Sequence, residues 1–227
     1  MKVSRMMALA IMESKDILKN LQVLCLFLVY PCIAFILSIS MKEEASFFIT
    51  VFATMHVVFT PITVMVNLLS EQKQHQIVRN LAYANVSSST YLLAHGFLIG
   101  TLCFVGGLVF LFLPGFELAI PSFLLSCLLG ILISILLGAL IALSSTSSSG
   151  ANGIAMPIAM LLSFVPMLAN FNETLRTVSE ILYSAQISNM MKDLSSISLW
   201  DMMVLILTTL ILVWLFIRAY HKSMKSE

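Results

Sequence analysis

The segment SFFITVFATMHVVFTPITVMVNLL, residues 46–69, carries no charged side chain from its first residue to its last. A helix needs about 20 mostly apolar residues to cross the hydrocarbon core of a bilayer. Lipid offers no hydrogen-bonding partner to an open backbone, so a segment in that core must be helical. Residues 46–69 are therefore predicted to form a membrane-spanning helix.

The composition of the whole chain agrees with this interpretation. Of its 227 residues, 59% are hydrophobic and only 10% are charged, whereas a soluble domain carries about 25% charged residues. Six segments are long and apolar enough to span, and they lie at about 21–40, 46–69, 91–113, 121–143, 151–169 and 200–218. We predict an all-α membrane protein with six transmembrane helices that form a single domain over residues 1–227.

The distribution of Lys and Arg indicates the orientation, because cytoplasmic loops are enriched in both residues. If both termini are cytoplasmic, nine of the 12 Lys and Arg residues lie on that side and three lie outside. The nine are Lys2, Arg5, Lys15, Lys19, Lys73, Arg79, Arg218, Lys222 and Lys225, and the three are Lys42, Arg176 and Lys192. We therefore predict that both termini and the loop between the second and third spans are cytoplasmic.

Two segments outside the spans show helical periodicity. Residues 3–19 are amphipathic, which is typical of a helix lying in the membrane interface; the alternative is a cytosolic extension of the first span. The outer loop at about 170–198 has two runs of apolar residues at helical spacing, which predict two short helices packed over the outer end of the bundle. These apolar positions are Met6, Met7, Ala10, Ile17 and Leu18 in the first segment, and Leu175, Val178, Ile181, Leu182, Ile187, Met190, Met191 and Leu194 in the loop.

The second span carries a polar stripe. His56, Thr60, Thr63 and Asn67 are spaced four, three and four residues apart, so they share one face of a helix. Polar side chains in a span rarely face lipid and usually point to the bundle interior or to a wet cavity. They could line a substrate path, or they could hydrogen-bond to other helices and only hold the bundle together. Pro61 allows a kink in the same helix in either case.

The fourth and fifth spans carry two further patterns. Small residues recur at every fourth position of the fourth span, which lets another helix approach closely; they are Ser122, Ser126, Gly130, Ser134, Gly138 and Ala142. One face of the fifth span, which also contains Pro157 and Pro166, carries Met156, Met160, Ser163 and Met167. Methionine adapts to varied apolar partners, so this face is interpreted either as core packing or as the wall of a substrate path.

The cytoplasmic loop begins with a charged stretch, SEQKQHQIVRN, residues 70–80. Ile77, Val78 and Leu81 form a small apolar face at helical spacing, and the polar face carries Glu71, Lys73, Gln74 and Arg79. A short helix held at the membrane surface between two spans can bind a soluble partner through such an apolar face.

No catalytic or metal-binding pattern is present in the sequence. None of the four histidines is followed by another His, Cys or carboxylate three or four residues later, and the phosphate-binding motif G-x-x-x-x-G-K-[ST] does not occur. A membrane-embedded enzyme would need a cluster of ionisable residues near one face. If the protein transports with ATP, another subunit must hydrolyse it.

The layout resembles the membrane subunits of ABC type-2 transporters, over nearly the whole chain. Those permeases have an interfacial helix, six spans, a cytoplasmic segment between spans two and three, and a helical outer loop between spans five and six. The family pattern E-x-x-x-G-T, followed by L-x-x-x-P-V-S, corresponds here to Glu71 in the acidic position, with His75-Gln76 in place of Gly-Thr. Asn85 stands in place of the proline, in NVSSSTYLLAHG (residues 85–96).

The resemblance implies a coupling helix at residues 71–84 that docks in a groove of a separate ATPase subunit, which binds ATP and Mg. Its docking residues are Glu71, Gln74, Ile77, Val78, Arg79 and Leu81. It also implies a second membrane subunit, identical or similar, and a central path lined by spans two and five. The lining residues are His56, Thr60, Thr63, Asn67, Met156, Met160, Ser163 and Met167. Neither a cofactor in this chain nor a nucleic acid is expected.

These observations predict the permease subunit of a bacterial ATP-binding cassette exporter in the plasma membrane. Its substrate would be amphipathic or hydrophobic, such as an antimicrobial or cytolytic peptide, a class that small permeases of this type resemble. The alternatives are a lipid or drug exporter and an ATP-independent carrier. A carrier would be favoured by an internal repeat or by acidic residues deep in a span, and neither is evident.

Overall fold

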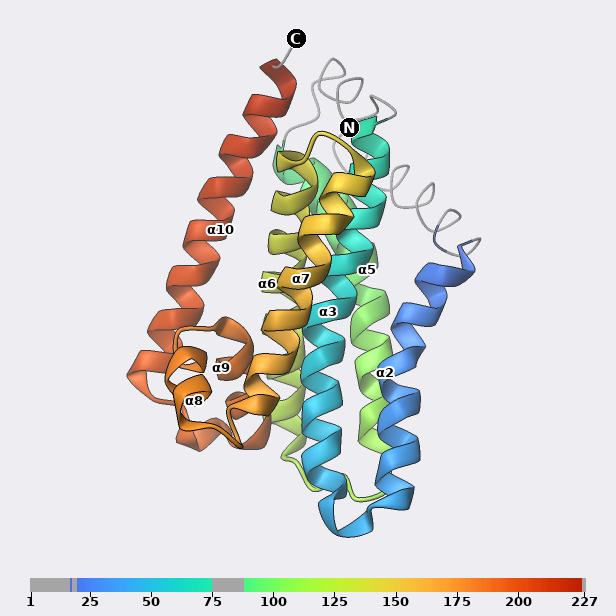
Figure 1. The fold of residues 1–227 in the computed structure, drawn as a ribbon, viewed down its shortest axis with the longest axis vertical. Helices are drawn as coiled ribbons and strands as arrows, with labels where there is room; N and C mark the ends of the chain where they lie inside the picture. Colours follow the sequence, from blue (N-terminus) through green and yellow to red (C-terminus); the bar gives the residue numbers. More distant parts are fainter. Residues whose placement is uncertain (1–16, 18–19, 75–87, 226–227) are drawn as a thin grey trace.

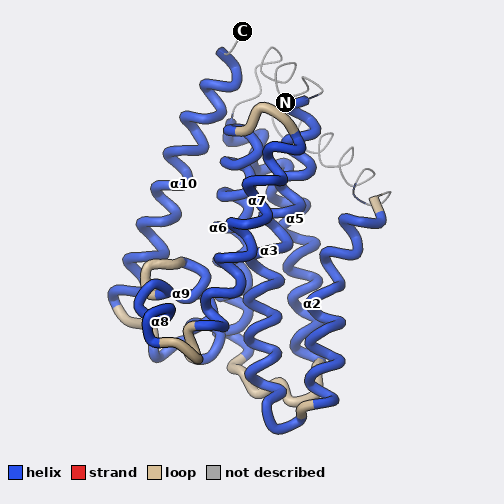
Figure 2. The backbone as a smooth tube through the Cα atoms, in the orientation of Figure 1, coloured by secondary structure: helices blue, strands red, loops and turns tan. Residues whose placement is uncertain are grey.

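The computed structural model describes residue 17 and residues 20–74 and 88–225, and every regular element in these ranges is helical (Figure 2). The long helices are α2 (Leu21–Ser40), α3 (Ala45–Gln74), α5 (Ser88–Leu108), α6 (Ile120–Ser144), α7 (Ser148–Leu168) and α10 (Leu199–Lys225). The short helices are α8 (Glu173–Ser179) and α9 (Tyr183–Lys192), with single 3-10 turns at Lys42–Glu44, Val109–Phe112 and Leu194–Ser196.

The six long helices confirm the predicted all-α architecture with six spans, since each is long and apolar enough to cross a membrane. The helix predicted at 46–69 continues to Gln74, because its last turn is polar but still helical. The interfacial helix predicted at 3–19 lies outside the described residues except for Ile17, whose side chain is buried.

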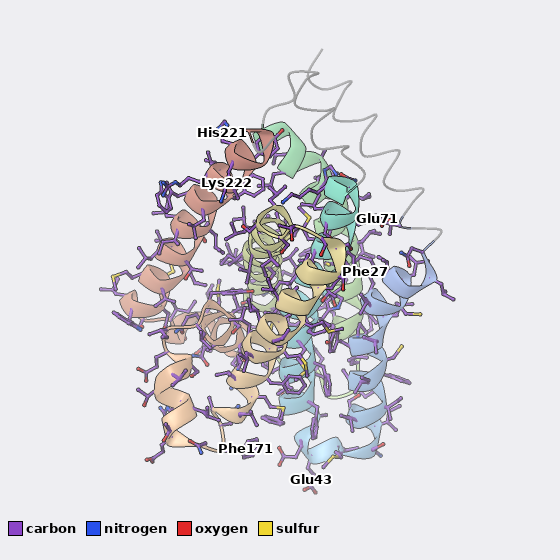
Figure 3. All side chains as sticks on the ribbon, turned by 45° about the horizontal axis from the view of Figure 1, so that its top comes forward. Phe27, Glu43, Glu71, Phe171, His221 and Lys222 are labelled. Atoms are coloured by element: carbon purple, nitrogen blue, oxygen red, sulfur yellow. The ribbon has the colours of Figure 1, made fainter. Side chains whose placement is uncertain are left out.

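The spans run alternately up and down in Figure 1. Figure 3 shows Glu71, His221 and Lys222 toward one end of the molecule and Glu43 and Phe171 toward the other. The end of α3 and the end of α10 thus lie on the same side of the bundle, and the first loop and the turn after α7 lie on the opposite side. This agrees with the arrangement that the Lys and Arg distribution predicts.

Helix α3 is the axis of the bundle. Of an 18-residue apolar stretch within α3, 89% is buried inside the protein, compared with 22% of the corresponding stretch in α10 and 28% in α2. It packs against α2, α5, α6, α7 and α9. The other spans therefore keep one face free, whereas α3 is covered on all sides along most of its length.

Short polar side chains mark the beginnings of several helices. Asn20 accepts a hydrogen bond from the backbone N–H of Val23 at the start of α2, and Asn172 accepts one from Leu175 at the start of α8. Ser198 and Asp201 cap α10 reciprocally, each side chain accepting from the other residue's backbone N–H. Such caps satisfy backbone donors that the first turn of a helix leaves unpaired.

The small residues of α6 form the packing surface against α3, as the four-residue spacing predicts. All six are buried. A Cβ added at Gly138 would lie 2.8 Å from the carbonyl oxygen of Ile62 and 2.9 Å from the Cβ of Met65, both on α3. Because membrane helices gain no hydrophobic free energy from associating, such close approach is what makes their contact favourable.

The two helices predicted in the outer loop are present, but they are buried to different degrees. In α9, Ile187, Met190 and Met191 are buried against α6 and α3, and the Tyr183 hydroxyl is 2.9 Å from the Ser134 hydroxyl of α6. Val178 on α8 and Ile181, which follows this helix, are exposed, because α8 packs mainly against the end of α7. Only α9 therefore covers the bundle as predicted.

We predict that Gly138→Ala destabilises the protein by about 1–3 kcal/mol, the usual cost of forcing extra volume into a packed contact. The nearest obstacle is backbone, so relaxation cannot be confined to a side chain. Thermal unfolding of the purified protein in detergent measures the effect. Gly153→Ala on α7 is the matched control, since its Cβ would meet nothing within 4 Å. Equal melting temperatures for the two variants would contradict the packing assigned to Gly138.

Candidate coupling site and substrate path

The C-terminal end of α3 is hydrogen-bonded to three other spans within four residues. The Ser70 hydroxyl donates to the Ser148 hydroxyl, 3.1 Å away at the start of α7. The Gln72 side-chain oxygen is 2.8 Å from Nε2 of His95 on α5, and both side chains are buried. Lys73 donates to the carbonyl oxygen of Ser145 at 2.6 Å and to that of Leu143, at the end of α6. This cluster joins α3 to α5, α6 and α7.

The Lys73 contact has a clear electrostatic basis. Ser145 is the C-terminal cap of α6, and the last carbonyl groups of a helix have no partner within the helix. These carbonyls carry the negative end of the helix dipole, so an ammonium group there is favoured twice, as a donor and as a positive charge. Lys73 is half-buried between the two helices, which strengthens such a contact relative to the open surface.

This cluster overlaps the first residues of the docking segment predicted at 71–84. Glu71 is exposed on the last turn of α3, and Gln74 is the final residue of that helix. The side chain of Gln74 and the residues Ile77, Val78, Arg79 and Leu81 lie outside the described part of the structure.

The sequence pattern placed Lys73 on the polar face of the docking segment but did not indicate its contact with the end of α6, and it did not indicate Gln72 at all. The partners of both residues are distant in the sequence, and no periodic pattern indicates them. The one local signal was the position of Lys73 in the last turn of a helix.

The polar stripe on α3 divides into two kinds of residue. His56 and Thr60 are fully buried and bond to neighbouring helices: Nε2 of His56 donates to the Cys103 carbonyl of α5 at 2.8 Å, and the Thr60 hydroxyl donates to the Leu26 carbonyl of α2 at 3.1 Å. Thr63 donates within α3 to the Phe59 carbonyl, and Asn67 is half-buried. For His56 and Thr60 these contacts favour the role of holding the helices together.

The methionine face of α7 also divides. Met156 and Met160 are exposed, whereas Ser163 is buried and Met167 is half-buried. Ser163 and Met167 line a cavity of about 10 Å³ with Thr50 and Thr54 of α3, close to the space that one water molecule needs. The Ser163 hydroxyl has no partner among the described residues. The structure thus brings part of this face together with α3 and leaves the other part open.

Thr50 and Thr54 were also missed by the sequence analysis. Each donates to the carbonyl four residues earlier, at Ser46 and Thr50 respectively. Their four-residue spacing on the second span was a signal that could have identified them.

We predict that Thr60→Val lowers the stability of the protein by about 0.5–2 kcal/mol, the range for one hydrogen bond between membrane helices. The change keeps the shape of the side chain and removes the donor to Leu26. Thermal unfolding in detergent is the measurement, and Thr60→Ser, which keeps the hydroxyl, is the control. A loss of transport by Thr60→Val without any loss of stability would instead place the hydroxyl on a substrate path.

Comparison with known proteins assigns the family. The sequence matches the family described as ABC-2 family transporter protein over residues 40–218, from the end of α2 to Arg218 in the C-terminal part of α10. No curated protein and no solved structure matches the chain. The match covers all of the spans except α2. It also covers the cluster of Ser70, Gln72 and Lys73 and the short helices α8 and α9. The chain therefore belongs to the ABC-2 transporter family, as a membrane-spanning transport component without an ATPase motif of its own.

Proposed function

We propose that this chain is the permease subunit of a bacterial ATP-driven exporter, and that a separate ATPase docks on residues 71–84. The observation that carries the proposal is the cluster at the end of α3. Ser70, Gln72 and Lys73 connect the helix that leads into the docking segment to α5, α6 and α7. A partner that binds next to this cluster acts on four spans at once.

The coupling follows from the central position of α3. Since α3 is buried along most of its length, it cannot move without displacing the helices packed on it. The ATPase binds ATP and Mg, and its change of conformation on hydrolysis shifts the docking segment. The hydrogen bonds of Gln72 and Lys73 then carry the shift to α5 and α6.

The substrate path in this proposal lies between two permease subunits, identical or similar. The exposed apolar face of α7, with Met156 and Met160, supports it, because an exposed apolar helix face is suited to a second subunit or a hydrophobic cargo. The adaptable thioether side chains fit an amphipathic or hydrophobic substrate, and we propose an antimicrobial or cytolytic peptide. Of the four stripe residues on α3, His56 and Thr60 bond to neighbouring helices. We place the other two, Thr63 and Asn67, at the wall of this path.

The proposed location is the bacterial plasma membrane, with both termini cytoplasmic. The excess of Lys and Arg at the end of the bundle that contains Lys73, Arg218 and Lys222 supports this orientation.

The docking proposal predicts that Ile77→Asp weakens ATPase binding at least about tenfold. Burying a side chain of this size contributes roughly 1.5–3 kcal/mol, and each 1.4 kcal/mol corresponds to a factor of ten. Co-purification of the ATPase with the permease is the measurement, after Ile77→Asp and the comparison variant Glu71→Ala are both shown to reach the membrane. Glu71→Ala, at the exposed rim of the segment, should cost much less. Unchanged co-purification with Ile77→Asp would place the ATPase elsewhere.

The coupling proposal predicts that Lys73→Met leaves the ATPase bound but lowers the amount of substrate exported per ATP hydrolysed. The variant removes the donor to the end of α6 while keeping the length of the side chain. Transport and ATP hydrolysis are measured together in reconstituted vesicles. Lys222→Met, an exposed cation at the same end of the bundle, is the matched control. Normal coupling in Lys73→Met would show that α6 is not driven through this contact.

A further inference from the structure

A polar chamber of about 600 Å³ lies at the outer end of the bundle, between the end of α7, the helices α8 and α9, and the start of α10. Four charged side chains line it: Arg176, Lys192, Glu180 and Asp201. Two are positive and two negative, so the chamber has no net charge but offers partners to both signs. A ligand that carries a single charge would leave half of these groups unmatched.

Gln186 supplies an independent indication that the chamber holds a ligand. Its side chain lines the chamber and is only 2% exposed. Its Nε2 donates to the Glu180 carbonyl at 2.6 Å, but its Oε1 has no partner among the described residues. Native proteins rarely leave a buried carbonyl oxygen unpaired. This oxygen can accept a hydrogen bond from any donor that enters the chamber, such as a water molecule or an ammonium group.

An apolar groove of about 490 Å³ lies next to the chamber, between α7 and α10 with α6 as its floor. The segment from Arg176 to Ile181, which contains the end of α8, borders both spaces. Arg176 and Glu180 line the chamber, whereas Val178 and Ile181 line the groove. Their position in the groove explains why these two apolar side chains are exposed. At the end of α7, the groove-lining Val165 is followed directly by the chamber-lining Pro166. The two spaces are therefore adjacent.

The depths of the two spaces match the layers of a membrane. The chamber lies where the candidate spans Ser148–Leu168 and Leu199–Lys222 reach their outer ends. Trp200 lines it and donates from Nε1 to the Glu180 carbonyl at 3.2 Å, and tryptophan is enriched at the level of the headgroups. From Asp201 in the chamber to Leu212 in the groove, α10 rises about 16 Å, roughly half of the 30 Å hydrocarbon core. The chamber and the groove together thus extend over about the thickness of one leaflet.

We propose that the chamber and the groove together bind one phospholipid of the outer leaflet, with a zwitterionic headgroup that ends in a primary ammonium. Arg176 and Lys192 pair with the phosphate. Glu180, Asp201 and the free oxygen of Gln186 accept hydrogen bonds from the ammonium. The acyl chains lie in the groove against α7 and α10. A quaternary ammonium has no N–H for Gln186, and an anionic headgroup leaves the two carboxylates unpaired. The site does not depend on which substrate is exported.

Photo-crosslinking tests this site on the full-length protein. The purified chain is reconstituted in vesicles that contain a phospholipid probe with a photoreactive acyl chain and either a phosphoethanolamine, a phosphocholine or a phosphoglycerol headgroup. Labelled peptides are then mapped by mass spectrometry. We expect the phosphoethanolamine probe to label α7, α8 or α10 about tenfold more than the other two, the factor that one charge-assisted hydrogen bond provides.

Matched variants separate the headgroup contacts from the fold. Glu180 is exposed, and Glu180→Gln keeps the backbone carbonyl that accepts hydrogen bonds from Gln186 and Trp200. This variant should abolish most of the preference for the phosphoethanolamine probe, and so should Gln186→Met. Glu173→Gln, at the start of α8 and outside the chamber lining, should keep the preference. Equal labelling by all three probes, or a preference unchanged in Glu180→Gln, would overturn the proposal. Crosslinking of this face to a second copy of the chain would identify it instead as a subunit interface.

Discussion

The close contact between α3 and α6 is the interaction on which the rest of the structure depends. Helices in lipid gain nothing from hiding apolar surface, so they associate through close packing and hydrogen bonds. At Gly138 the backbone of α6 comes so near to Ile62 that a methyl group would not fit. This contact places α3 at the centre of the bundle, and the remaining spans pack around that pair.

The central position of α3 gives its polar residues two different tasks. In the middle of the helix, His56 and Thr60 donate to backbone carbonyls of α5 and α2, which holds the inner face of the bundle together. At its C-terminal end, Gln72 and Lys73 bond to α5 and to the end of α6. The same helix that organises the membrane core therefore leads directly into the segment proposed to receive the ATPase.

The other end of the bundle, where α8 and α9 lie, is arranged differently from the end that carries Gln72 and Lys73. There α9 is buried against α6, while α8 remains at the rim with its apolar side chains exposed. Charged and polar side chains collect on one side of α8 and apolar ones on the other. One end of the bundle thus carries the hydrogen-bonded cluster beside the proposed docking segment, and the other end carries the amphipathic surface on which we propose a lipid.

The sequence by itself determined the number of spans, their approximate bounds, the helical outer loop and the four-residue seam on α6, because these depend on local hydrophobicity and spacing. Helix beginnings such as Asn20 and Asn172 were likewise local, since a cap bonds to a residue three positions away. Only the tertiary structure decided which polar residues meet. Gln72 meets His95, and Thr60 meets the Leu26 carbonyl, through helix packing that no local pattern encodes. The outer chamber draws its walls from four helices for the same reason: its residues are distant in the chain and become neighbours only when α7, α8, α9 and α10 pack together.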